Sequence, residues 1–181
     1  MLPSQLAKSG TEEAEQTALF AYVNAARLHG FEIADMWAEI GTPALAKSSF
    51  KETGIPALPQ LAWFHAIANG GARGDNKKSA MIRGAQLKAT GVKAGVADTF
   101  LPYPVFRGYY HNAEPTYYHG LYIEMKVRSK KPKREGSKGG MSDEQIEFRD
   151  WALANSYGFA TCYGWEEARD IIKSYVEYSP L

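Results

Sequence analysis

One short apolar segment carries an acid and a lysine two positions apart, Glu124 and Lys126. The positions that alternate with them are apolar: Leu121, Ile123, Met125 and Val127. This period-two pattern predicts a strand with one face on a core, and it directs Glu124 and Lys126 to the same side. A carboxylate and an ammonium so placed can serve metal-assisted hydrolysis of a phosphodiester, or they can form a simple ion pair on a solvated strand.

Two further acidic positions bear on this choice. Asp98 lies within an apolar stretch, where a buried carboxylate is costly unless it is paired; alternatively, it caps a turn after Gly95.

Glu12 opens a predicted helix from Thr11 to about His29, and we expect it to point inward with the apolar face of that helix. The first turn of this helix contains three acids: Glu12, Glu13 and Glu15. We expect at least two of them only to complement the helix dipole.

The net charge of the 181-residue chain is only +1, so attraction to nucleic acid has to come from local clustering. A basic cluster follows the predicted strand, and only Glu135 opposes it: Arg128, Lys130, Lys131, Lys133, Arg134 and Lys138. We predict that this basic segment contacts nucleic acid. The alternative is a solvated loop that keeps a sheet edge from aggregating.

Composition and motifs exclude several classes of protein. Cys162 is the only cysteine, which excludes an internal disulfide framework and a cysteine-based zinc site. The histidines lack the spacing of a zinc hydrolase, and no phosphate-binding loop of a nucleotide hydrolase is present. Residues 1–10 lack the apolar core of a signal peptide, and no apolar run is long enough to span a bilayer, so we expect a cytoplasmic protein.

The predicted elements follow the order helix, about three strands, helix, strand, helix. This order is typical of an α/β domain with a mixed central sheet flanked by helices, and it brings Glu12, Asp98, Glu124 and Lys126 within reach of one another. We expect one domain over residues 1–181, with a helix and loop insertion at 31–60. The other predicted elements are strands at 61–68, 92–106 and 159–163, turns at 69–71 and 107–115, and helices at 79–90, 142–158 and 165–178. Three tryptophans are predicted to lie in the core: Trp63, Trp151 and Trp165.

Ser142 and Gln145 match a capping box, in which the glutamine bonds back to the start of its helix. The same side chain can instead point across to Glu124 or Lys126. Gln145 is therefore a candidate both for a structural role and for a role in the site.

The pattern of Asp98 followed by Glu124 and Lys126 resembles the PD-(D/E)XK nuclease superfamily. Further segments of the sequence are similar to its virus-type replication-repair nuclease (VRR-NUC) branch. The similar segments are 69–71, 91–98, 120–126, 141–145 and 163–168. They cover nearly the whole chain apart from the insertion. The chain departs from the family at Ala97, where a proline generally precedes the acid; this removes a rigid turn but no ligand.

The resemblance implies a restriction-endonuclease-like core and a Mg²⁺-dependent DNA endonuclease in which Mn²⁺ can substitute. Asp98, Glu124 and the Met125 carbonyl are the expected metal ligands. Lys126 would orient the attacking water and either accept its proton or stabilise the developing charge. The helix acid is expected to be Glu12, with Glu13 as the alternative; family similarity also favours a site role for Gln145.

The implied partner is branched DNA, and the implied activity is that of a Holliday-junction resolvase acting as a homodimer in a bacterial or phage-infected cell. One alternative is a non-selective nickase or exonuclease in phage DNA processing. Another is a catalytically silent nucleic-acid-binding module. No recognition helix or second DNA-binding domain is evident, which favours recognition of backbone or shape over a long sequence.

Overall fold

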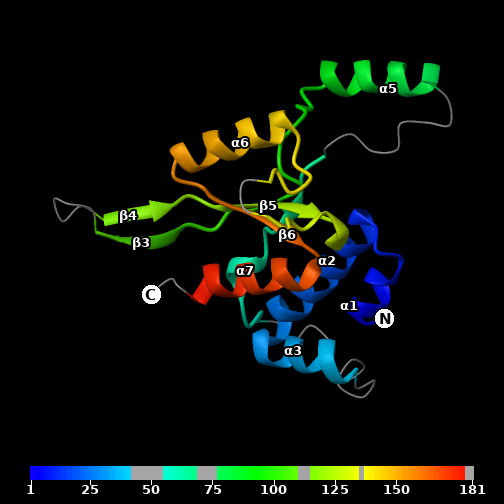
Figure 1. Cartoon of the computed structure of the whole chain (residues 1–181). Helices are drawn as coiled ribbons and strands as arrows, with labels where there is room; N and C mark the ends of the chain where they lie inside the picture. Colours follow the sequence, from blue (N-terminus) through cyan, green and yellow to red (C-terminus); the bar gives the residue numbers. More distant parts are fainter. Residues whose placement is uncertain (42–54, 69–76, 110–114, 135–136, 178–181) are drawn as a thin grey trace.

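The computed structural model describes residues 1–41, 55–68, 77–109, 115–134 and 137–177 (Figure 1). Its helices are α1 (Pro3–Leu6), α2 (Glu12–His29), α3 (Phe31–Ile40), α5 (Lys77–Ala89), α6 (Asp143–Ala154) and α7 (Trp165–Glu177). Its strands are β1 (His65–Ala66), β2 (Thr99–Leu101), β3 (Val105–Tyr109), β4 (Pro115–Tyr118), β5 (Leu121–Lys126) and β6 (Gly158–Tyr163). Short 3₁₀ helices span Ala7–Ser9, Pro59–Leu61 and Arg128–Lys130.

Four strands form a mixed sheet in the order β1-β2-β5-β6. The β1–β2 and β2–β5 pairs are antiparallel, whereas β5 and β6 run parallel. Helix α6 lies on one side of this sheet, and α2 and α7 lie on the other (Figure 1). The predicted α/β architecture with a mixed sheet flanked by helices is therefore confirmed.

The main core lies between the sheet and the pair α2 and α7. It contains Leu19 from α2, Ile123 and Met125 from β5, and Ile172 from α7, all with no exposed surface. Helix α2 begins where the sequence predicts, because the Thr11 hydroxyl accepts a hydrogen bond from a backbone N–H of its first turn. Burial of this apolar face is the main contribution that stabilises the packing of α2 against the sheet.

A polar network ties α3 to α2 and α7. The Asp35 carboxylate accepts hydrogen bonds from the Tyr22 hydroxyl at 2.7 Å and from Lys173 Nζ at 2.5 Å. Burial alone would raise the pKa of Asp35, but the hydrogen bonds from Lys173 and Tyr22 outweigh it and lower the pKa below its ordinary value. The ionised carboxylate therefore stabilises the native state.

We expect Asp35→Asn to lower the free energy of unfolding at pH 7 by about 1–3 kcal/mol, because a charge-assisted hydrogen bond to Lys173 is lost. The folded-state pKa of Asp35 is depressed, so its contribution is present above the unfolded pKa and is lost as the pH falls through the folded value. Urea unfolding at pH 7 and pH 3 checks this. An equal destabilisation at both pH values would contradict it.

Several predicted elements differ from the structure. The predicted strand at 61–68 is only the two-residue edge strand β1, preceded by a 3₁₀ helix. The predicted turn at 107–115 instead contributes strand residues to the hairpin of β3 and β4. Helix α6 ends at Ala154, and Gly158 already belongs to β6. The core assignment is right for Trp165 but wrong for Trp63 and Trp151, which are exposed.

Part of the predicted insertion belongs to the core. Helix α3 buries Ala34 and Trp37 against α2. The predicted turn at 69–71, and most of the insertion beyond residue 41, lie outside the described residues. Within the described ranges, no helix combines the length and apolarity needed to cross a bilayer.

Candidate active site

Strand β5 presents the acid and the lysine on one face of the sheet. Glu124 is 1% exposed and Lys126 is 5% exposed, and Lys126 Nζ donates a hydrogen bond to Glu124 Oε1 at 2.6 Å. The alternate residues Ile123 and Met125 are buried in the main core. The prediction that Glu124 and Lys126 share a face is confirmed, whereas the alternative of a solvated surface pair is wrong because both side chains are buried.

Asp98 lies directly before β2, where antiparallel pairing of Thr99 with Ile123 brings it beside β5. Its Oδ2 accepts a hydrogen bond from the Met125 backbone N–H at 2.8 Å. The N–H and C=O of one strand residue point toward the same neighbouring strand, so the Met125 carbonyl faces the Asp98 edge. The three predicted metal ligands are thus neighbours in the structure.

The acidic groups of this cluster outnumber its one ammonium group. Burial and the charge of Asp98 raise the pKa of Glu124 to about 7, while Lys126 opposes the increase and Glu12 adds to it. Burial alone would lower the pKa of Lys126, but its hydrogen bond to Glu124 raises it above the ordinary value. Lys126 is therefore protonated at neutral pH, and Glu124 is an acid whose charge the protein only partly compensates.

The two oxygens of Glu124 have different surroundings. Oε1 accepts hydrogen bonds from Lys126 Nζ and Gln145 Nε2. Oε2 is buried, and no hydrogen bond reaches it from the part of the chain that the structure describes. A buried carboxylate oxygen without a partner is costly, and a cation beside it would remove that cost.

Gln145 makes both of the contacts predicted for it. Its Oε1 accepts a hydrogen bond from the Ser142 N–H at 2.9 Å, and Ser142 Oγ accepts one from the Gln145 N–H at 3.3 Å. This capping box starts α6. The remaining amide donor, Nε2, reaches Glu124 Oε1. One side chain therefore fixes the start of α6 and the orientation of the buried acid.

The prediction that Glu12 points inward is wrong. Its side chain is 42% exposed and pairs with Lys130 at 3.2 Å. The buried acid of α2 is Glu15, at 2% exposure, one turn further along the same helical face. Glu12 is the first residue of α2 and lies beyond the packed surface, whereas Glu15 precedes Leu19 by four positions and shares its buried face.

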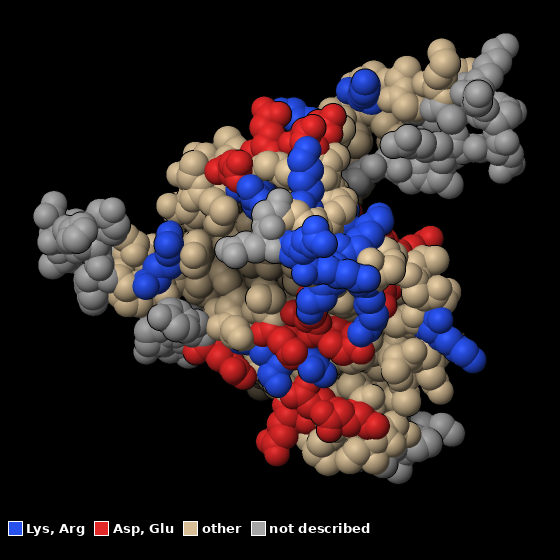
Figure 2. Space-filling view, in the orientation of Figure 1, with Lys and Arg blue, Asp and Glu red and all other residues tan. Residues whose placement is uncertain are grey.

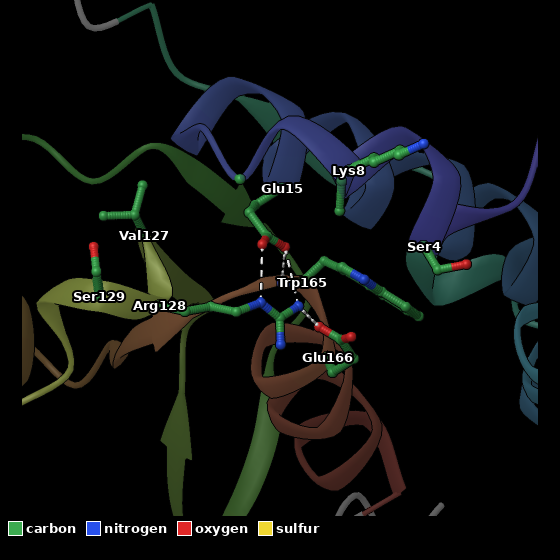
Figure 3. Close-up of a pocket in the computed structure, with 10 residues that line it drawn as sticks. Ser4, Lys8, Glu15, Val127, Arg128, Ser129, Trp165 and Glu166 are labelled. Carbon is green, nitrogen blue, oxygen red and sulfur yellow. Dashed lines mark hydrogen bonds and ion pairs between the residues drawn. The ribbon is translucent and has the colours of Figure 1, made fainter.

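Glu15 binds partners from two distant segments. It accepts a hydrogen bond from Arg128 Nε at 3.0 Å and one from the Trp165 backbone N–H at 2.9 Å. The Arg128 guanidinium lies between the carboxylates of Glu15 and Glu166, beside a pocket of about 390 Å³ (Figure 3). The expectation that at least two of the three acids only complement the helix dipole is wrong, because Glu12 and Glu15 both form ion pairs.

We expect Glu15→Ala to lower the free energy of unfolding by about 2–3 kcal/mol, because it leaves the buried N–H of Trp165 without an acceptor. Glu13→Ala is the matched control, since Glu13 is an exposed acid in the same helical turn. Denaturant unfolding of the two variants beside the wild type measures both changes. Equal effects for the two substitutions would show that the contacts of Glu15 do not stabilise the fold.

Much of the basic segment is already paired within the fold. Arg128 binds Glu15 and Glu166, and the remaining ion pairs are Lys130 with Glu12, Lys131 with Glu167, and Lys138 with Asp143. Figure 2 shows basic and acidic side chains gathered side by side near the middle of the molecule. Lys133 and Arg134 are exposed and form no ion pair with any other described residue. Contact of the six basic residues with nucleic acid stays a prediction.

Comparisons with known proteins give limited similarity. No protein-family model and no curated protein matches the chain. Among solved structures, a chain described as a VRR_NUC domain protein is similar, with 21% sequence identity and a TM-score of 0.43 over 78% of this chain and 88% of that chain. At this degree of similarity, function has to be argued from the site itself.

Proposed function

We propose that the protein is a metal-dependent nuclease that hydrolyses phosphodiester bonds at Asp98, Glu124 and Lys126. The observation that carries this proposal is the buried carboxylate of Glu124, one oxygen of which receives no hydrogen bond from the described residues; the same carboxylate lies beside a second acid and contacts a lysine. A permanent structural ion pair would be expected to satisfy both carboxylate oxygens. A site for a cation and a phosphate explains why one oxygen is left without a hydrogen bond.

The donor atoms fit a hard divalent cation. Asp98, Glu124 and the Met125 carbonyl would hold Mg²⁺ or Mn²⁺, and the bound cation would supply Lewis acidity where negative charge develops on the phosphate. No group of three or more His, Cys, Asp or Glu side chains in the described ranges is arranged to hold a metal. The proposed donors are all oxygens, and this favours Mg²⁺ over zinc, because Mg²⁺ binds through one or two carboxylates and keeps several waters.

Lys126 would act as a fixed positive charge. Because the hydrogen bond to Glu124 raises the pKa of Lys126, its ammonium favours orienting the attacking water over accepting its proton. It can orient that water and stabilise the charge that develops on the phosphate oxygens. Gln145, through its hydrogen bond to Glu124 Oε1, would keep the carboxylate turned so that Oε2 faces the cation.

Mg²⁺ or Mn²⁺ binding should stabilise the native state. At a metal concentration ten times Kd, we expect the melting temperature to rise by roughly 3–5 °C at pH 8. The increase should be smaller at pH 6, because protons compete for Glu124, whose pKa is raised to about 7. Thermal unfolding of the wild type and Glu124→Gln at both pH values tests this. An equal increase in the variant would place the cation elsewhere.

The finer part of the proposal is cleavage of branched DNA by a homodimer. The experiment compares cleavage of a labelled four-way junction, a flap and a plain duplex in Mg²⁺, with the molar mass measured by light scattering. Selective, paired cutting of the junction by a dimer is the expected result. Cutting of all three substrates would leave a non-selective nickase or exonuclease, and binding without cutting would leave a silent module.

A further inference from the structure

We propose that Lys130 is a displaceable counter-ion of the site: it holds Glu12 aside until metal and nucleic acid bind, and so couples the two binding events. This inference rests on the proposed nuclease function. In it, Lys130 is a positioning residue that acts through Glu12.

The ion pair between Lys130 and Glu12 is weak enough to exchange. Lys130 Nζ lies 3.2 Å from Glu12 Oε1, and the two side chains are 48% and 42% exposed. Pairs at this exposure contribute little to stability because water screens them. The carboxylate of Glu12 forms no other hydrogen bond or ion pair with the described residues, so release from Lys130 would leave it able to turn.

The backbone is shaped to receive Lys130. The residue ends the 3₁₀ turn that follows β5, and its aliphatic stem lies against Gly140. A Cβ at Gly140 would come within 2.7 Å of Lys130 Cδ, and the glycine has φ +79°. The glycine therefore leaves room for the lysine stem, which directs the ammonium toward the start of α2.

Glu12 lies at the end of β5 that carries Lys126. Its partner Lys130 follows that strand in the turn Arg128–Lys130, and Glu15, one helical turn further along α2, contacts Arg128 of the same turn. The charge of Glu12 also contributes to raising the pKa of both Glu124 and Lys126. With Lys130 paired to it, the charge of Glu12 is compensated while no metal is bound. Bound metal would attract the freed carboxylate, directly or through water, and would thereby weaken the hold on Lys130.

A nucleic-acid phosphate would act on the other partner of the same ion pair. The phosphate attracts the Lys130 ammonium, which releases Glu12 toward the metal. Metal and nucleic acid each break the pair, so each binds more tightly once the other is bound, and the coupling must be reciprocal.

The test is Ca²⁺ binding to DNA-free protein by calorimetry. Ca²⁺ takes the same oxygen ligands as Mg²⁺. Removing the positive charge in Lys130→Ala or Lys130→Gln should raise the Ca²⁺ affinity about two- to fivefold, the range for loss of one exposed ion pair. Lys130→Gln retains most of the stem that packs against Gly140, so it separates loss of charge from loss of packing.

The matched control is Lys138→Ala, which removes another exposed ion pair of the same segment, that with Asp143. We expect it to leave the Ca²⁺ affinity unchanged. In a Glu12→Gln background, Lys130→Gln should also lose its effect. Fluorescence anisotropy with a labelled duplex, with and without Ca²⁺, should show that the metal tightens DNA binding to the wild type more than to Lys130→Gln.

Equal changes in Lys130→Gln and Lys138→Ala, or an effect of Lys130→Gln that survives in Glu12→Gln, would overturn the inference and leave the nuclease proposal intact. If the wild type binds no Ca²⁺, or if Asp98→Ala binds Ca²⁺ as tightly as the wild type, both the inference and the nuclease proposal would be overturned. Cleavage assays with Asp98→Ala distinguish these two failures.

Discussion

Glu124→Gln should reduce the single-turnover rate of DNA cleavage in Mg²⁺ by about 10³-fold, the upper range for removal of one preorganised charged group. The substitution keeps the shape of the side chain and leaves an amide oxygen that can accept the hydrogen bonds of Lys126 and Gln145. It removes the negative charge that would hold the cation. The loss should therefore arise from chemistry and metal binding rather than from unfolding.

Glu32→Gln is the control for Glu124→Gln, because it neutralises an exposed acid on α3, outside the cluster. Its cleavage rate should match that of the wild type. Melting temperatures without metal check that both variants fold. A Glu124→Gln enzyme within threefold of the wild-type rate would contradict the assignment of Glu124 as a metal ligand.

Lys126→Met should reduce the cleavage rate by about 10²- to 10³-fold, because it removes the positive charge that we propose stabilises the reacting phosphate. It also removes the cation that opposes the raised pKa of Glu124. This acid then holds its proton to higher pH. Metal affinity should therefore fall more at pH 6 than at pH 8.

The pH dependence separates Lys126 from a purely structural lysine. Calorimetric metal titrations of Lys126→Met at pH 6 and pH 8, beside the wild type, measure it. An equal loss of metal affinity at both pH values would show that Lys126 does not act through the charge of Glu124. Lys93→Met is a suitable control, since Lys93 is an exposed lysine before β2.

The central pair of the site could be predicted because its signal is local. Alternation of apolar and polar residues over β5 is sufficient to put Glu124 and Lys126 on one side. The start of α6 could be predicted for the same reason, since Ser142 and Gln145 are three residues apart. The hydrogen bond of Gln145 to Glu124 could be stated only as an alternative, because it spans 21 residues.

The arrangement of charges could not be predicted, because it depends on long-range contacts. The sequence of the basic segment predicts a surface for nucleic acid. In the fold, however, Arg128 binds Glu15, which is 113 residues away in sequence, and Lys130 binds Glu12, which is 118 residues away. Helical phase puts Glu12 and Glu15 on one face, but only the packed fold shows where the buried surface of α2 ends. The sequence signal for Glu15 was its spacing of four from Leu19.

Which tryptophans are buried could not be predicted from the sequence either. Trp63 and Trp151 are exposed although tryptophan is usually buried. Trp63 adjoins β1, which pairs with β2 alone among the described strands and lies at the edge of the sheet. Trp151, in the last turn of α6, stacks on Phe148 and on Tyr157 and remains half in solvent.

The central claim is hydrolysis of DNA at the cluster of Asp98, Glu124 and Lys126. Its most direct test is cleavage of end-labelled four-way junction and linear duplex by purified wild type and Asp98→Ala, in Mg²⁺ and in EDTA. We predict cutting by the wild type in Mg²⁺ that stops in EDTA and is lost in Asp98→Ala. Equal cutting by the variant, or no cutting by the wild type in either Mg²⁺ or Mn²⁺, would contradict the claim.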